Sequence, residues 1–139
     1  MRILALDFGK KRIGVAISDE LGITAQGLPT VERTNIREDL ARLAGLVRER
    51  AVERIVLGFP LHLSGAEGRQ AQRVKEFGER LARAAGVPVE YFDERLTSVE
   101  ANRVLRESGI SIEKRARAVD RLAAVILLEG YLDRLRFEL

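Results

Sequence analysis

The first eighteen residues constrain the fold most strongly, because they contain two short apolar runs joined by a basic turn. The runs Ile3–Phe8 and Ile13–Ser18 are rich in aliphatic and β-branched residues, which favour β-strands. The connection Gly9–Arg12 has a length that hairpins commonly use. We therefore expect an antiparallel β-hairpin at the start of the chain.

Asp7 departs from this pattern, since the neighbouring residues of the first run are apolar. A charge at the rim of a core is unfavourable unless it is paired, so the carboxylate needs a partner. The sequence is compatible with two kinds of partner: the amides and cations of the following turn, or a divalent metal ion.

The remaining strands indicate the fold class. A third strand from Ile23 to Arg33 contains Pro29, which restricts it to the edge of a sheet. Apolar runs at 54–58 and 87–92 are typical of buried parallel strands, and helical patterns separate them. This order predicts an α/β fold, with three antiparallel strands and then parallel strands in one mixed five-stranded sheet flanked by helices on both faces.

Capping residues mark the expected helix starts. The pairs that fit a helix N-terminus are Asn35 with Glu38, Ser64 with Glu67, and Thr97 with Glu100. A final helix is expected from about Ala118 to Arg136. The polar, basic segment Gly109–Arg117 before it has no apolar period, so we expect a mobile flap there.

Composition excludes several classes of function. The 139 residues fit a single domain, 1–139, and the absence of cysteine removes disulfides, thiolate metal sites and thiol catalysis. No apolar stretch is long enough to span a bilayer and no signal-peptide pattern is present, so we expect a cytoplasmic protein without a membrane partner. The net charge of +3 is a mild bias towards polyanions.

Acidic residues stand where an α/β sheet gathers its ligands. Asp7 and the pair Asp93–Glu94 lie at the carboxyl ends of strands, which is where such sheets bind ligands. Asp120 interrupts an otherwise apolar final helix; it fits either a first-turn acid paired with Arg117 or Arg121, or a member of the same acidic group.

Three carboxylates in one dry site would repel one another. Mg²⁺ or Mn²⁺ would relieve this repulsion, because these cations take oxygen ligands and bind phosphate oxygens. Two such ions about 3.5–4 Å apart can activate water and stabilise a leaving oxygen, so the grouping favours phosphodiester hydrolysis with two ions and substrate bound.

Several motifs resemble the YqgF/RuvX family over essentially the whole chain. They are Asp7-Phe-Gly9, Gly58-Phe-Pro60, Asp93-Glu-Arg-Leu-Thr97, and Asp120 followed by Ala123-Ala124. The resemblance implies a ribonuclease H-like fold and a metal-dependent nuclease that matures the ends of pre-16S ribosomal RNA, earlier taken for a Holliday-junction resolvase. It also implies that Asp7, Glu94 and Asp120 are the catalytic, metal-binding acids, with Asp93 as the alternative to Glu94.

Small and basic residues flank the proposed site and are candidates for contact with nucleic-acid phosphates. They are Gly9, Lys10, Lys11, Arg12, Arg95, Lys114, Arg115 and Arg117. The only histidine, His62, lies in a loop, where a surface role is commoner than proton transfer. No exposed aromatic row for stacking bases is evident, so recognition is expected to use backbone and shape.

The expected substrate is structured RNA, above all precursor rRNA, or branched DNA, and ribosomal particles are a further candidate partner. The chain is expected to act as a monomer or a homodimer. A sugar-kinase or ATPase module is disfavoured by the small size and by the absence of a Walker loop. A non-catalytic RNA-binding factor remains the other rival, and the presence of all three acids disfavours it.

Overall fold

The computed structural model describes residues 1–59, 68–93, 103, 106–107, 109 and 111–137. Its elements in chain order are β1 (Ile3–Phe8), β2 (Arg12–Ser18), β3 (Ala25–Glu32), α1 (Ile36–Glu49), β4 (Arg54–Phe59), α2 (Arg69–Ala85), β5 (Val89–Asp93) and α4 (Ile112–Phe137). All five predicted strands are therefore confirmed. The helix predicted after Thr97 lies almost wholly outside the described residues, as do His62 and the capping pair Ser64 and Glu67.

The strands form one mixed sheet in the order β3-β2-β1-β4-β5. β2 pairs antiparallel with both β1 and β3, whereas β4 pairs parallel with both β1 and β5. The predicted α/β fold class is thereby confirmed. β3 is an edge strand, as Pro29 predicts, and its register against β2 shifts between Ile13 and Val15, opposite the segment that contains Pro29.

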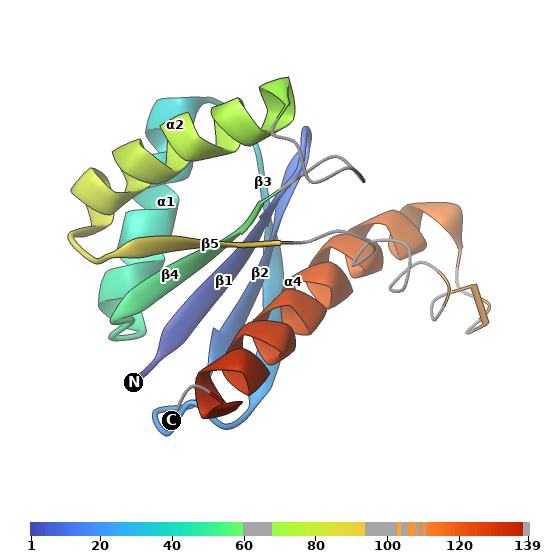
Figure 1. The fold of residues 1–139 in the computed structure, drawn as a ribbon. Helices are drawn as coiled ribbons and strands as arrows, with labels where there is room; N and C mark the ends of the chain where they lie inside the picture. The colour runs from blue at the N-terminus through green and yellow to red at the C-terminus, as the bar shows by residue number, and fades with distance from the viewer. Residues whose placement is uncertain (60–67, 94–102, 104–105, 108, 110, 138–139) are drawn as a thin grey trace.

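Helices cover both faces of this sheet (Figure 1): α1 and α2 lie on one face and α4 lies on the other. The side chains of β1 divide between two cores accordingly. Leu4 and Leu6 belong to the core with α1 and α2, while Ile3 and Ala5 belong to the core with α4. Because side chains alternate along a strand, the row of Ile3 and Ala5 continues to Asp7.

Capping chemistry places the helices of the first face. The Asn35 side chain accepts a hydrogen bond from the backbone N–H of Glu38 at 2.9 Å, which confirms the predicted cap of α1. α2 follows Gly68 and ends at Gly86, whose φ of 72° is the left-handed conformation that commonly stops a helix.

α4 begins at Ile112, so the final helix starts about six residues before the predicted Ala118, and residues 112–117 are helical rather than irregular. The mobility predicted for the segment 109–117 stays a prediction. Glutamate, lysine, arginine and alanine are strong helix formers, so residues 112–117 can form a helix although their sequence has no apolar period. Ser111 supports the start, because its Oγ accepts a hydrogen bond from the backbone N–H of Lys114 at 3.4 Å. Among the helices in the described part of the chain, none is long and apolar enough to cross a membrane.

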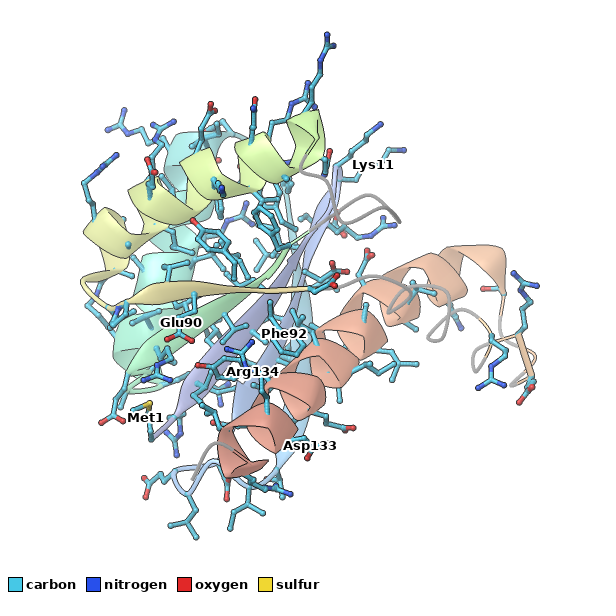
Figure 2. All side chains as sticks on the ribbon, in the orientation of Figure 1. Met1, Lys11, Glu90, Phe92, Asp133 and Arg134 are labelled. Carbon is cyan, nitrogen blue, oxygen red and sulfur yellow. The ribbon has the colours of Figure 1, made fainter. Side chains whose placement is uncertain are left out.

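Tyr131 holds the second half of α4 on the sheet, and its side chain is fully buried. Its hydroxyl donates to Glu90 of β5 and accepts from Nη1 of Arg54 of β4 at 2.7 Å. Its ring meets Phe92 edge-on, with centroids 6.0 Å apart, and Figure 2 shows Glu90 and Phe92 on the α4 side of β5. Burial raises the pKa of the Tyr131 hydroxyl, and its hydrogen bond to Glu90 raises it further, so the group keeps its proton. These contacts fix α4, and Asp120 with it, along the sheet.

Candidate active site

Asp7 is the penultimate residue of β1 and lies on the face of the sheet that α4 covers. Its Cα partner in β2 is Gly14. Directly paired residues of antiparallel strands lie on the same face, so Asp7 and Gly14 both face α4. Asp7 is half-buried in this position.

Gly14 is a point of direct contact between α4 and the backbone of the sheet. A Cβ atom on Gly14 would lie 2.0 Å from the carbonyl oxygen of Asp120 and 2.6 Å from its carbonyl carbon. No side chain fits in that space, so glycine lets the backbone of α4 rest on β2. Since Gly14 is also the partner of Asp7, this packing brings Asp7 and Asp120 together from opposite ends of the chain.

Asp120 is paired with Arg12, the first residue of β2. Nε of Arg12 donates to Oδ2 of Asp120 at 2.9 Å, and the two side chains are 22% and 25% exposed. The alternative pairing with Arg121 is not formed, because Nε of Arg121 donates to the carbonyl oxygen of Leu28 at 3.0 Å. A partly exposed ion pair contributes little to stability, but it orients the carboxylate of Asp120.

Asp93 lies on the other face of the sheet. It is the last residue of β5, and its Cα partner in β4 is Phe59, which belongs to the core with α1 and α2. Tyr91, two residues earlier in the same row, also packs against that core. The sheet therefore separates Asp93 from Asp7. The other acid of the pair, Glu94, lies outside the described residues.

The donor set of this site fits a hard divalent cation. Asp7 and Asp120 offer carboxylate oxygens, which Mg²⁺ and Mn²⁺ prefer over nitrogen or sulfur ligands. Across the ranges 1–59, 68–93 and 111–137, no three acidic or histidine side chains group closely enough to hold a metal ion. Those ranges thus supply two of the three predicted ligands.

The basic turn between β1 and β2 has a defined conformation. The N–H of Gly9 donates to the carbonyl oxygen of Arg12 at 3.0 Å, which closes the turn. Arg33 holds it from the side: its Nη1 donates to the carbonyl oxygen of Gly9 and its backbone N–H donates to that of Lys11, both at 2.9 Å. Lys10 and Lys11 are exposed, and Figure 2 shows Lys11 projecting from the tip of the hairpin.

The other predicted phosphate-binding residues are described in part. Lys114 is exposed on α4 and, with Arg121, lines an open groove of about 720 Å³ between β3 and the first half of α4. The structure does not describe the side chains of Arg95, Arg115 and Arg117.

Sequence reasoning assigned no functional role to Gly14 and Gly27, yet both glycines let α4 pack closely on the sheet. A Cβ on Gly27 would lie 2.6 Å from Cγ of Arg121, whose side chain crosses β3 at this point. A glycine within a strand pattern signals a close approach of another segment, so the sequence did carry a signal at both positions.

Solved structures share this arrangement of sheet and helices. Thermus thermophilus RuvC in complex with a Holliday junction substrate gives a TM-score of 0.60 at 17% identity, over 98% of this chain and 96% of that chain. The Fowlpox virus resolvase in complex with Holliday junction DNA gives a TM-score of 0.58 at 14% identity, over 97% of this chain and 99% of that chain. The predicted class, a ribonuclease H-like fold of the RuvC type, is confirmed.

The chain belongs to the RuvX family, described as Holliday junction resolvase, whose family model matches residues 1–134. A relative from Koribacter versatilis is 55% identical over 133 residues, covering 96% of this chain and 87% of the relative. A relative from Agathobacter rectalis is 51% identical over 136 residues, covering 96% of this chain and 95% of the relative. Both carry the name "Putative pre-16S rRNA nuclease". The predicted family and the predicted enzyme class, a nuclease hydrolysing phosphodiester bonds, are confirmed.

Proposed function

We propose that this nuclease is a cytoplasmic, divalent-metal-dependent enzyme that cleaves precursor 16S rRNA during ribosome biogenesis, at a site formed by Asp7, Glu94 and Asp120. The observation that carries the site is the register of β1 and β2, which sets Asp7 opposite Gly14, together with the contact of Gly14 with Asp120. The position of Asp93 on the other face favours Glu94 as the third acid.

The three carboxylates would hold Mg²⁺ or Mn²⁺. When bound, such ions supply an activated water and stabilise the leaving oxygen of the phosphodiester. The protein's part is to orient the ligands: Arg12 holds the carboxylate of Asp120, and Tyr131 and Gly14 fix the helix that carries it. Arg12 also brings positive charge to the rim, where a substrate phosphate arrives.

A second candidate substrate is branched DNA. The description of the family as Holliday junction resolvase, and the similarity of the fold to RuvC bound to a Holliday junction, favour it. The two relatives with 55% and 51% sequence identity are instead named for pre-16S rRNA, and each matches 96% of this chain. We therefore propose RNA as the substrate and keep branched DNA as the alternative.

The deciding experiment incubates the protein with precursor 16S rRNA, an unrelated structured RNA and a four-way DNA junction, each with Mg²⁺, Mn²⁺ or EDTA. Metal-dependent cleavage of the precursor near its mature ends is the expected result. Cleavage of the junction alone would support the resolvase alternative. Binding of RNA without cleavage under every condition would support a non-catalytic factor and contradict the proposed function.

We expect the exposed lysines of the hairpin tip to bind phosphates without reading sequence. The variant Lys10→Ala/Lys11→Ala should bind two unrelated structured RNAs about tenfold more weakly, because each lysine that neutralises a phosphate releases counterions. The slope of log K against log salt should become shallower by roughly one unit for each phosphate that the variant no longer neutralises. Fluorescence anisotropy across a salt series measures both quantities.

Glu20→Ala is a suitable control for this variant, since Glu20 is exposed at the opposite end of β2. It should leave the salt slope unchanged. A loss of affinity confined to one RNA, with the wild-type slope, would contradict sequence-independent phosphate binding by Lys10 and Lys11.

A further inference from the structure

A second concave site lies on the face of the sheet opposite Asp7. It is a pocket of about 240 Å³ between the start of α1 and the middle of α2. Its polar lining consists of Arg33, Arg73, Glu76 and Arg80. Its apolar lining consists of Phe8, Ile36 and Phe77. We call this site the arginine pocket.

The charges of the arginine pocket are unbalanced. Arg73, Glu76 and Arg80 are exposed and lie on one face of α2, at a helical spacing of three and four residues. In the described part of the chain, neither Arg73 nor Arg80 forms a hydrogen bond or an ion pair. Arg33 is balanced by Asp39 beneath it, at 3.6 Å. The two uncompensated cations of the lining, Arg73 and Arg80, therefore face a single carboxylate, that of Glu76.

Arg33 is fixed in place before any ligand arrives. Its guanidinium carbon lies 4.3 Å from the centre of the Phe8 ring, and its Nε lies 3.6 Å from Oδ2 of Asp39. Asp39 is buried and is also held by Arg42, whose Nη2 donates to its Oδ1 at 2.8 Å. Nε of Arg33 is buried without a hydrogen-bond partner within the described residues. A guanidinium held in this way loses little conformational entropy on binding.

The base of the pocket is apolar. Phe8 and Phe77 pack with their ring centroids 4.5 Å apart, and Ile36 stays 40% exposed at the rim. An apolar surface beside guanidinium groups lowers the local dielectric, which strengthens their attraction for an anion. Planar guanidinium groups also match the oxygens of a phosphate in paired hydrogen bonds. The chemistry of the pocket therefore fits a phosphate group.

Arg33 also connects the pocket to the basic turn, since it donates to the carbonyl oxygens of Gly9 and Lys10. Phe8, in the pocket, directly follows Asp7, which faces α4. Asp7 and the pocket therefore lie at the same end of β1 on opposite faces, so one nucleic-acid strand that passes round this end would contact both through phosphates a few nucleotides apart.

We infer that the arginine pocket binds a backbone phosphate of the nucleic-acid substrate a few nucleotides from the bond that is cut. The strand would pass from Asp7 over the lysines of the hairpin tip to Arg73 and Arg80. The path of the strand from Asp7 rests on the proposed function, because it takes Asp7 as part of the catalytic site. The binding of nucleic-acid phosphate in the pocket is testable without cleavage.

The test compares three double variants in EDTA, where no cleavage occurs, with a structured RNA and fluorescence anisotropy as the readout. Arg73→Ala/Arg80→Ala should bind about tenfold more weakly, with a salt slope shallower by roughly one to two units. Arg48→Ala/Arg83→Ala removes the same charge at exposed positions outside the pocket and should stay within about twofold of wild type. Arg73→Lys/Arg80→Lys should keep most of the wild-type salt slope, since the charge is retained.

Equal reductions in affinity in the first two variants would overturn the inference, because they would reflect total charge alone. A loss of adenosine monophosphate binding in Arg73→Ala/Arg80→Ala, with RNA binding intact, would also overturn it in favour of a site for free nucleotide. Failure of the wild-type protein to cleave any of the substrates in the presence of metal contradicts the proposed function instead. The binding comparison remains decisive for the pocket in that case.

Discussion

Replacement of Asp7 by asparagine is expected to reduce metal-dependent cleavage by roughly 10³-fold or more. Metal ions supply several kcal/mol of transition-state stabilisation, and about 1.4 kcal/mol corresponds to a tenfold change in rate. Asparagine keeps the shape of the side chain and removes its charge. The fold should therefore persist, and single-turnover cleavage of the RNA substrate under saturating Mg²⁺ is the measurement.

Asp93→Asn is the matched control for Asp7→Asn. Asp93 is also an aspartate at the end of a strand, but its Cα partner in the neighbouring strand is Phe59, and both residues belong to the other face of the sheet. Its amide variant should retain cleavage within a few fold of wild type. Loss of activity in Asp93→Asn with normal activity in Asp7→Asn would show that the catalytic site lies on the face with α1 and α2 instead.

Gly14→Ala is expected to destabilise the protein by about 3 kcal/mol, at the upper end of the range for overpacked cores. The added Cβ would lie 2.0 Å from the carbonyl oxygen of Asp120, and the obstructing atoms belong to backbone, which has no rotamer to change. α4 must therefore move away from β2. This movement displaces Asp120 from Asp7, so cleavage should fall as well. Urea unfolding monitored by circular dichroism measures the loss of stability.

Gly45→Ala provides the control for the effect of an added methyl group. Gly45 lies inside α1, and apart from its chain neighbours and the adjacent backbone of its own helix, the nearest heavy atom to an added Cβ would be Nη2 of Arg48 at 3.9 Å. Alanine in a helix interior is favoured over glycine by roughly 0.5–1 kcal/mol, so this variant should be as stable as wild type or more stable. If Gly14→Ala unfolds at the same urea concentration as wild type, the backbone of α4 does not rest on β2 at Gly14.

Local signals in the sequence predicted the sheet well. The hairpin follows from two β-rich runs around a short turn, and the edge position of β3 follows from Pro29. The start of α1 follows from Asn35, whose side chain caps the backbone N–H of Glu38. Each of these features depends on residues close together in the chain, so a pattern over a few positions suffices.

The candidate site depends on contacts that no local pattern contains. Arg12 and Asp120 belong to opposite ends of the chain, and only the packing of α4 on β2 at Gly14 brings them together. The face of Asp93 depends on its pairing with Phe59, so a shift of one residue would have exchanged the two acids. The first turns of α4 escaped prediction because their helix-forming charged residues show no apolar period in the sequence.

The most direct test of the central claim is an anomalous difference map from a crystal of the protein soaked in Mn²⁺. Our account predicts a peak within coordination distance of carboxylate oxygens of both Asp7 and Asp120, roughly 2.0–2.2 Å, with Glu94 as the third protein ligand. The same soak of Asp7→Asn crystals should give no peak there. A map from wild-type crystals with no manganese beside Asp7 and Asp120, or with manganese bound through Asp93 alone, would contradict it.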